Sequence, residues 1–100
     1  MKTLQQVEKE LKEFIERFLP AGKLSVEMVK EWVYEENGAP LEASHKFQDK
    51  FFEYFEKTEV DINEILQIAT DAWNYFPHKT LGGKSPYQMT EEYQKKDRQK

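Results

Sequence analysis

The chain of 100 residues contains no cysteine and only four glycines and four prolines. Without cysteine, these residues can form no disulfide framework, no thiolate zinc site and no cysteine nucleophile. The sequence also lacks an apolar run long enough to span a membrane, and its first residues lack the apolar region of a signal peptide. We therefore expect a cytoplasmic protein that has no membrane-bound part and keeps its fold without disulfides.

Aromatic residues are what the chain has in quantity. It contains seven Phe, five Tyr and two Trp, and 38% of its residues are hydrophobic. A disordered chain would not carry so many large apolar rings, and 100 residues suffice for one domain with a modest core. We expect a single domain over residues 1–93 and a polar, frayed tail over residues 94–100.

The spacing of the apolar residues predicts an all-α fold. No segment alternates in the manner of a β-strand, and apolar residues recur every three or four positions. The pattern predicts four main helices, at 4–19, after Ser25, from Pro40 and after Asp61, followed by a short one from Pro86. Short connections favour antiparallel neighbours, so we expect a small bundle. The third helix carries the most aromatic residues, and we expect it to be the most buried element.

Capping residues mark most of the expected helix ends. Asn37-Gly38 is expected to end the second helix and Pro77 the fourth. Ser25 is the expected N-cap of the second helix, and Pro40 fits the start of the third. Capping boxes are predicted from the pairs Thr3 with Gln6, Asp61 with Glu64, and Ser85 with Gln88.

Charge is unevenly distributed along the chain. Residues 1–76 carry nine Lys/Arg and sixteen Asp/Glu, a net charge of −7, whereas residues 77–100 carry six and three, a net charge of +3. An acidic body repels nucleic acid and anionic membranes, so it argues against broad binding to either. The basic end has two interpretations, namely favourable cations near a helix C-terminus or a site for a specific anionic partner.

The segment 73–87 is the strongest candidate for a functional surface, because it combines aromatic residues, prolines, glycines and basic side chains in fifteen positions. The rings of Trp73, Phe76 and Tyr87 either clamp the loop onto the bundle or form an exposed platform beside Lys79 and Lys84. His78 either acts in acid–base chemistry or anion binding, or is a structural histidine bonded to a loop carbonyl. The candidate binding residues are Trp73, Phe76, His78, Lys79, Lys84 and Tyr87.

Two short motifs do not carry the chemistry that they suggest. Gly83-Lys84-Ser85 resembles the end of a phosphate-binding loop, but His78 stands where that loop needs glycine, and a helix precedes it instead of a strand. Glu42 and His45 have the spacing of one half of a di-iron motif, whose other copy and further Glu residues are absent, so a solvated face is the better interpretation. We predict no metal, no cofactor and no catalytic residue.

The segment Trp73 to Pro86 resembles a stretch found in prokaryotic helical proteins of unknown activity. In those proteins a Trp-Asn-x-Phe-Pro-His-x-x-Leu-Gly-Gly-Lys-Ser-Pro loop precedes a SEC-C motif, a small zinc module rich in cysteine. Gln94 to Lys100 is similar to the linker that leads to the module, which a chain without cysteine does not contain. The resemblance implies a helical domain associated with SEC-C and no known activity.

The same segment is similar to the C-terminal tail of integrase-type transposases, which carry Tyr-Asn-x-x-Arg-Pro-His-x-x-Leu-Gly-Gly-x-Thr-Pro. Phe76 stands where that pattern has arginine. The catalytic domain of those enzymes is a sheet with three carboxylates, whereas the residues upstream are helical here. Transposase activity is therefore rejected, and only a shared loop and helix cap remain.

We expect a non-enzymatic helical interaction domain that presents the 77–86 loop, or a face of the bundle, to a protein partner. The alternative is a nucleic-acid-associated accessory domain that uses Lys79, Lys84, His78 and the basic tail. An enzyme with His78 in a pocket is the weakest of the three. The sequence leaves the identity of the partner and the oligomeric state open.

Overall fold

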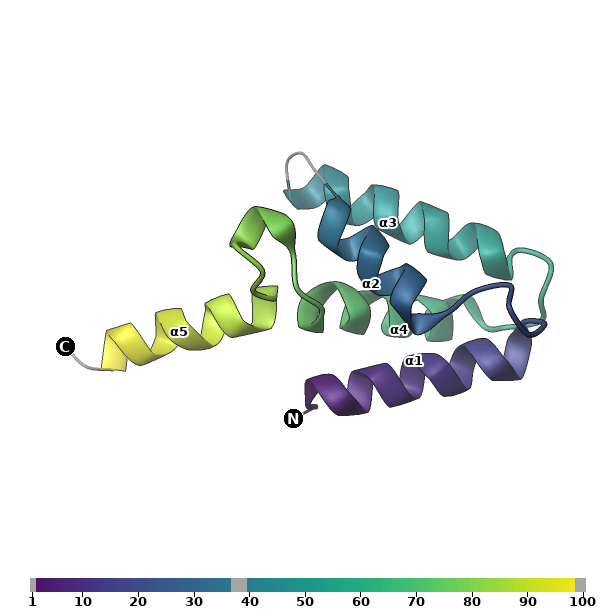
Figure 1. The fold of residues 1–100 in the computed structure, drawn as a ribbon, viewed down its shortest axis with the longest axis horizontal. Coiled ribbons are helices and arrows are strands. Elements are labelled where there is room, and N and C mark those ends of the chain that lie inside the picture. Colours follow the sequence, from purple (N-terminus) through teal and green to yellow (C-terminus); the bar gives the residue numbers. More distant parts are fainter. Residues whose placement is uncertain (1, 37–39, 99–100) are drawn as a thin grey trace.

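The computed structural model describes residues 2–36 and 40–98 and confirms the all-α prediction. Within these residues it contains five α-helices and one 3₁₀ turn, arranged as four main helices with a smaller C-terminal one (Figure 1). The elements are α1 (Leu4–Phe18), α2 (Val26–Glu35), α3 (Pro40–Phe55), α4 (Ile62–Tyr75), η1 (Lys79–Leu81) and α5 (Pro86–Arg98).

The caps form largely as the sequence predicts. The Thr3 hydroxyl accepts from the Gln6 amide at 3.1 Å, and the Gln6 side chain accepts from the Thr3 amide at 2.8 Å. The Ser25 hydroxyl accepts from the Met28 amide at 3.2 Å. Helix α2 ends at Glu35, and the predicted stop at Asn37-Gly38 lies outside the described residues.

One predicted capping box takes a different form. Asp61 is the N-cap of α4, but its carboxylate accepts from the amide of Asn63 at 2.8 Å. The amide of Glu64 donates instead to the backbone carbonyl of Asp61 at 3.0 Å. Because this tight first turn already satisfies the Glu64 amide, the capping-box bond to the Asp61 side chain is not needed.

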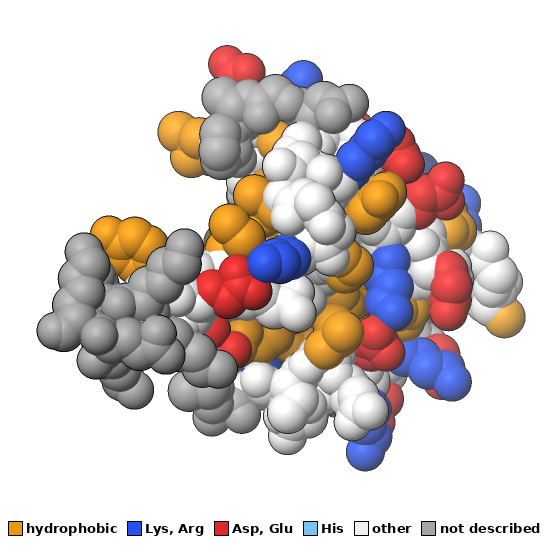
Figure 2. Space-filling model, turned by 60° about the vertical axis from the view of Figure 1, so that its left-hand side comes forward, with side chains coloured by type: hydrophobic (Ala, Val, Ile, Leu, Met, Phe, Trp, Pro, Cys, Tyr) orange, Lys and Arg blue, Asp and Glu red, His pale blue; other side chains and the backbone are white. Residues whose placement is uncertain are grey.

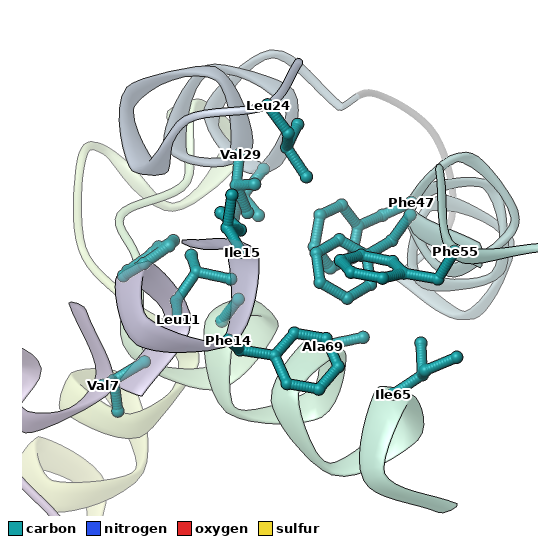
Figure 3. Packing of buried hydrophobic residues seen from close by; sticks show 14 residues of the cluster. Val7, Leu11, Phe14, Ile15, Leu24, Val29, Phe47, Phe55, Ile65 and Ala69 are labelled. Atoms are coloured by element: carbon teal, nitrogen blue, oxygen red, sulfur yellow. The ribbon is translucent and has the colours of Figure 1, made fainter. Parts of the chain in front are cut away.

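The core lies between α1, α3 and α4 and is closed on one side by α2. Figure 3 shows Phe14 of α1 and Phe55 of α3 extending into the core from opposite sides, and their ring centroids are 4.9 Å apart. Along α3, the predicted stripe Phe47, Phe51 and Phe55 is at most 2% exposed. These tilted rings fill the space between the helices and stabilise the packing beyond the area that they bury.

Helix α4, and not the aromatic α3, is the central element. It contacts α1, α2, α3 and α5, while the outer side of α3 faces solvent and leaves Leu41 69% exposed. The physical reason is side-chain size: Ala69 and Ala72 are fully buried, and such small residues let neighbouring helices approach α4 on several sides. Aromatic content predicted which residues fill the core but not which helix occupies its centre.

Helix α5 lies outside the bundle. It projects from one end of a molecule whose longest dimension is 50 Å, and the connection between α1 and α2 lies at the other end (Figure 1). From Gln88 to Gln94 every residue is exposed. The helix continues to Arg98, into the polar stretch in which fraying is expected.

Candidate functional site

Residues 77–86, which link α4 to α5 and include Pro86, the first residue of α5, are termed the elbow. Helix α4 ends where Phe76 adopts an extended conformation ahead of Pro77, as predicted from the proline. The chain then makes the single turn η1 and passes through Gly82 and Gly83, whose φ angles are +67° and +85°. Two successive residues at positive φ require glycine, which explains the Gly-Gly pair without any phosphate-binding role.

The backbone of His78 closes the elbow. Its amide donates to the carbonyl of Lys84 at 3.0 Å, and its carbonyl accepts from the amides of Leu81 and Gly83 at 3.1 and 2.9 Å. At the far end of the elbow, the Ser85 hydroxyl accepts from the Gln88 amide at 3.1 Å, and the Gln88 side chain accepts from the Ser85 amide at 2.8 Å. This predicted capping box is confirmed, and it fixes the direction in which α5 leaves.

The side chain of His78 is a structural group. It is 3% exposed, and its Nε2 lies 2.7 Å from the carbonyl oxygen of Trp73. Its ring meets the Trp73 ring edge-on, with centroids 4.4 Å apart. Burial lowers the pKa of His78 below the usual 6.5 and outweighs the hydrogen bond to the Trp73 carbonyl, which acts in the opposite direction. The bond to a backbone carbonyl agrees with the structural alternative, but this carbonyl belongs to the last turn of α4 and not to the loop, and the ring is buried.

The aromatic residues around the elbow clamp it to the bundle, which was the first of the two predicted alternatives. Phe76 is fully buried, and Lys30 of α2 lies over its ring with Nζ 5.6 Å from the centroid. Trp73 is partly buried and its ring is 5.7 Å from that of Phe47. Tyr87, at the start of α5, stacks on Tyr75 of α4 with ring centroids 4.8 Å apart.

The two lysines of the predicted site are both exposed but differ in their contacts. Lys79 is exposed in η1. Lys84 is also exposed, but its Nζ lies 2.8 and 2.9 Å from the two carboxylate oxygens of Glu92 on α5. This ion pair joins the elbow to α5 and gives Lys84 a carboxylate partner within the chain. Of the six predicted binding residues, Phe76 and His78 are therefore buried, Trp73 and Tyr87 are packed, and the lysines are accessible.

The most accessible apolar groups near the elbow belong to α5. Met89 is 41% exposed and Tyr93 is 70% exposed, and their four-residue spacing places them on one face of the helix. Figure 2, in which the α5 end comes forward, shows hydrophobic side chains beside charged ones on this side of the protein. The sequence predicted this short stripe as part of the last helix, but not that it would stand free of the bundle.

A buried charge that the sequence analysis missed lies on α4. The side chain of Asp71 is 12% exposed, and one of its oxygens lies 2.6 Å from Nζ of Lys2. Its other oxygen accepts from the Gln67 amide at 3.2 Å, and Lys2 also donates to Glu10 at 2.7 Å. These carboxylates raise the pKa of Lys2, Asp71 contributing most. The four-residue spacing of Gln67 and Asp71 on one helix could have predicted the hydrogen bond between them, but no sequence pattern linked either residue to Lys2.

A groove, also missed, runs along α1 and the start of α2. Its volume is about 740 Å³, and it extends along α1 from Gln5 to Glu16 and includes the loop, from Leu19 to Ser25, that leads into α2. Apolar groups of Ile15, Leu24 and Val26 line it. Part of its lining is the connection between α1 and α2, which lies at the end of the molecule opposite α5 (Figure 1).

Glu42 and His45, the isolated half of a metal motif, are both exposed on α3. Across residues 2–36 and 40–98 the structure holds no group of three or more His, Cys, Asp or Glu side chains placed to bind a metal ion. Over the same residues, no helix has the length and apolar character needed to cross a membrane.

No protein family, curated protein or solved structure matches this chain. The similarity of residues 73–86 to the loop before a SEC-C motif thus stays a prediction. The elbow, α5 and the groove are the features from which a function can be inferred.

Proposed function

We propose that this chain is a non-enzymatic helical interaction domain whose binding element is α5, held in place by the elbow. The observation that carries the proposal is the run of exposed residues from Gln88 to Gln94, with Met89 and Tyr93 on one face. A folded chain has no need of a helix that contributes so little to its own core. An exposed amphipathic helix is a common way in which one protein docks on another.

The elbow supports this proposal because it orders α5 in advance. The Ser85 capping box, the Tyr75–Tyr87 stack and the Lys84–Glu92 ion pair all join the first turns of α5 to the elbow or to α4. A binding element that is already ordered loses less conformational entropy on association. On this proposal the glycines, the prolines and the buried His78 of the elbow serve to aim α5, and the protein acts in the cytoplasm.

The electrostatics favour a protein partner over nucleic acid. The structure pairs Lys84 with Glu92, so a phosphate would have to compete with this carboxylate for one of the two lysines on which the nucleic-acid alternative depends. The bundle behind the elbow carries the net charge of −7 of residues 1–76. Repulsion from this charge opposes the approach of a phosphate backbone.

The test is site-specific photo-crosslinking in the cell of origin. A photoreactive phenylalanine analogue replaces Tyr93 in one variant and Leu41 in a control, because these side chains are 70% and 69% exposed but lie on α5 and α3. We expect protein adducts from position 93 and few from position 41. Equal yields at both positions, or adducts to nucleic acid from position 93, would contradict the proposal, and the second outcome would establish the accessory-domain alternative.

A further inference from the structure

The elbow fixes the direction in which α5 leaves the bundle. Of its residues 77–86, all of which the structure describes, His78 alone carries a buried ionisable side chain. We propose that His78 makes the elbow an acid-sensitive latch, in which protonation of the ring opens the elbow and frees α5 to change direction. This inference rests on the proposed function, since it concerns how binding through α5 is regulated.

The backbone of His78 is the point at which the two ends of the elbow meet. Its three hydrogen bonds, with Lys84, Leu81 and Gly83, close the elbow. Lys84 directly precedes Ser85, whose capping box starts α5. Movement of His78 therefore breaks all three bonds and loosens the chain that leads into α5. The ring stack at the start of α5 remains, but a single pair of rings does not fix the direction of a helix.

The ring of His78 occupies a site that suits its neutral form. Its Nε2 lies 2.7 Å from the carbonyl oxygen of Trp73. Because a carbonyl only accepts, Nε2 carries the hydrogen, and Nδ1 is the atom that takes up a proton in acid. The ring is 3% exposed and lies edge-on against the Trp73 ring. A charge placed there is shielded from water, which is costly unless an opposite charge is paired with it.

The elements packed around the elbow supply no such opposite charge. Their ionisable groups near it are Asp71 and Tyr75 of α4, Lys30 of α2, Lys79 and Lys84 of the elbow, and Tyr87 of α5. The one carboxylate among them, Asp71, is bound to Lys2, and the carboxylates of α2 itself are exposed. Burial lowers the pKa of His78, and only the Trp73 carbonyl acts in the opposite direction, so no charge stabilises the protonated ring.

The elbow is also the part of this region that opens most easily. Residues 79–80 and 82–84 are exposed, whereas Phe76, just before the elbow, is fully buried. Segments whose backbone hydrogen bonds lie near solvent open at a lower free energy than the core does. A protonated His78 can therefore reach water by opening the elbow, while the packing of the four main helices is kept.

The size of the response follows from the uptake of one proton. In the closed elbow the pKa of His78 lies below its usual 6.5, and in the open elbow the ring regains the usual value. The open form thus binds the proton more tightly, and acid favours opening. Between the two values, the equilibrium constant for opening rises by up to about tenfold for each unit by which the pH falls.

Amide hydrogen exchange, followed by NMR on the full chain, measures this opening. The amides of His78, Leu81 and Gly83 report on the elbow, and that of Leu19, bonded at the end of α1, reports on the bundle. The pH series runs from about 7.5 to about 5, the range in which histidine titrates. After correction for the intrinsic pH dependence of exchange, protection in the elbow should fall by up to about tenfold per unit, and Leu19 should keep its protection.

The direction of α5 is measured separately, by the distance between two spin labels. The labels are attached to Glu13→Cys on α1 and Gln94→Cys on α5, which are exposed positions in a chain without cysteine of its own. The distribution of distances should broaden over the same pH interval in which the elbow loses protection. His78→Gln should remove this response, because glutamine donates a hydrogen bond but does not titrate. His45→Gln, the same change at an exposed histidine, should keep it.

A distance distribution that is the same at both ends of the pH series would overturn the inference. So would a loss of protection at Leu19 together with the elbow, since acid would then unfold the whole domain. A pH response that persists in His78→Gln would assign the effect to another group. None of these measurements involves a partner, so crosslinking from position 93 at neutral pH tests the proposed function independently.

Discussion

The elbow and α5 are neighbours in the sequence but use their apolar side chains in opposite ways. Phe76 and His78, before and within the elbow, are 0% and 3% exposed, whereas Met89 and Tyr93 on α5 are 41% and 70% exposed. The elbow has irregular backbone, which must find hydrogen-bond partners and packs closely to do so. Helix α5 satisfies its own backbone and can project into solvent. A loop thus serves the fold here, and a regular helix is left exposed.

The largest expected change in stability concerns Phe76, the fully buried residue next to the elbow. Phe76→Ala should lower the free energy of unfolding by about 3–5 kcal/mol, because it leaves a cavity at a fully buried position. Leu41→Ala, at a position that is 69% exposed, should change it by less than about 0.5 kcal/mol. Urea denaturation of both variants measures the difference, and a loss below about 1 kcal/mol for Phe76→Ala would mean that the elbow is not packed on the core.

The second prediction concerns the buried carboxylate of α4, to which Lys2 is bound. Asp71→Ala should cost about 1–3 kcal/mol, since it removes charge-assisted hydrogen bonds and leaves Lys2 and Gln67 without this partner. Glu16→Ala removes a partner of the exposed Lys12–Glu16 pair, 4.0 Å apart, and should cost less than about 0.5 kcal/mol. Equal losses in chemical denaturation would show that the Asp71 network contributes no more than a surface pair.

The third prediction is a pH dependence that originates in the elbow. Because the folded protein lowers the pKa of His78, the unfolded chain binds this proton more readily. The contribution of His78 to stability is complete above the usual value of 6.5 and is lost as the pH falls from there through the lowered value. The His78→Gln variant should therefore lose less stability than the unmodified chain between pH 7.5 and 5, an interval of about the range in which histidine titrates.

The control for this prediction is the second histidine. His45 is exposed on α3, so His45→Gln makes the same substitution at a site that is not packed in the core. Thermal denaturation across the pH series distinguishes the variants. If His78→Gln and the unmodified chain gave parallel curves, His78 would have the same proton affinity in the folded and unfolded states.

The smallest expected change in stability concerns the exposed residues of α5, Met89 and Tyr93. Met89→Ala and Tyr93→Ala should each change the free energy of unfolding by less than about 0.5 kcal/mol, because neither side chain packs on the bundle. The measurement is made at low protein concentration, where mass action does not couple folding to association. A loss of about 2 kcal/mol or more would show that α5 packs on its own bundle, and the helix would no longer be free to bind a partner.

The sequence by itself determined the local features of this protein. The period of apolar residues located the helices, and Thr3, Ser25, Ser85 and Pro77 marked helix ends that the structure confirms. These features depend on residues three or four positions apart, and local backbone chemistry decides them. For the same reason, the Gly82-Gly83 turn could be predicted, whereas the burial of His78 and its bond to the Trp73 carbonyl at the end of α4 could not.

Only the tertiary structure decided which surfaces meet. It placed α4 at the centre, paired Asp71 with Lys2 across 69 residues of sequence, and left α5 in solvent. It also formed the groove between α1 and α2. Each of these outcomes depends on how whole helices pack, because the same apolar stripe on α5 can cover its own bundle or stand exposed. The direction set by the elbow determines which of the two occurs, and this direction cannot be read from apolar spacing alone.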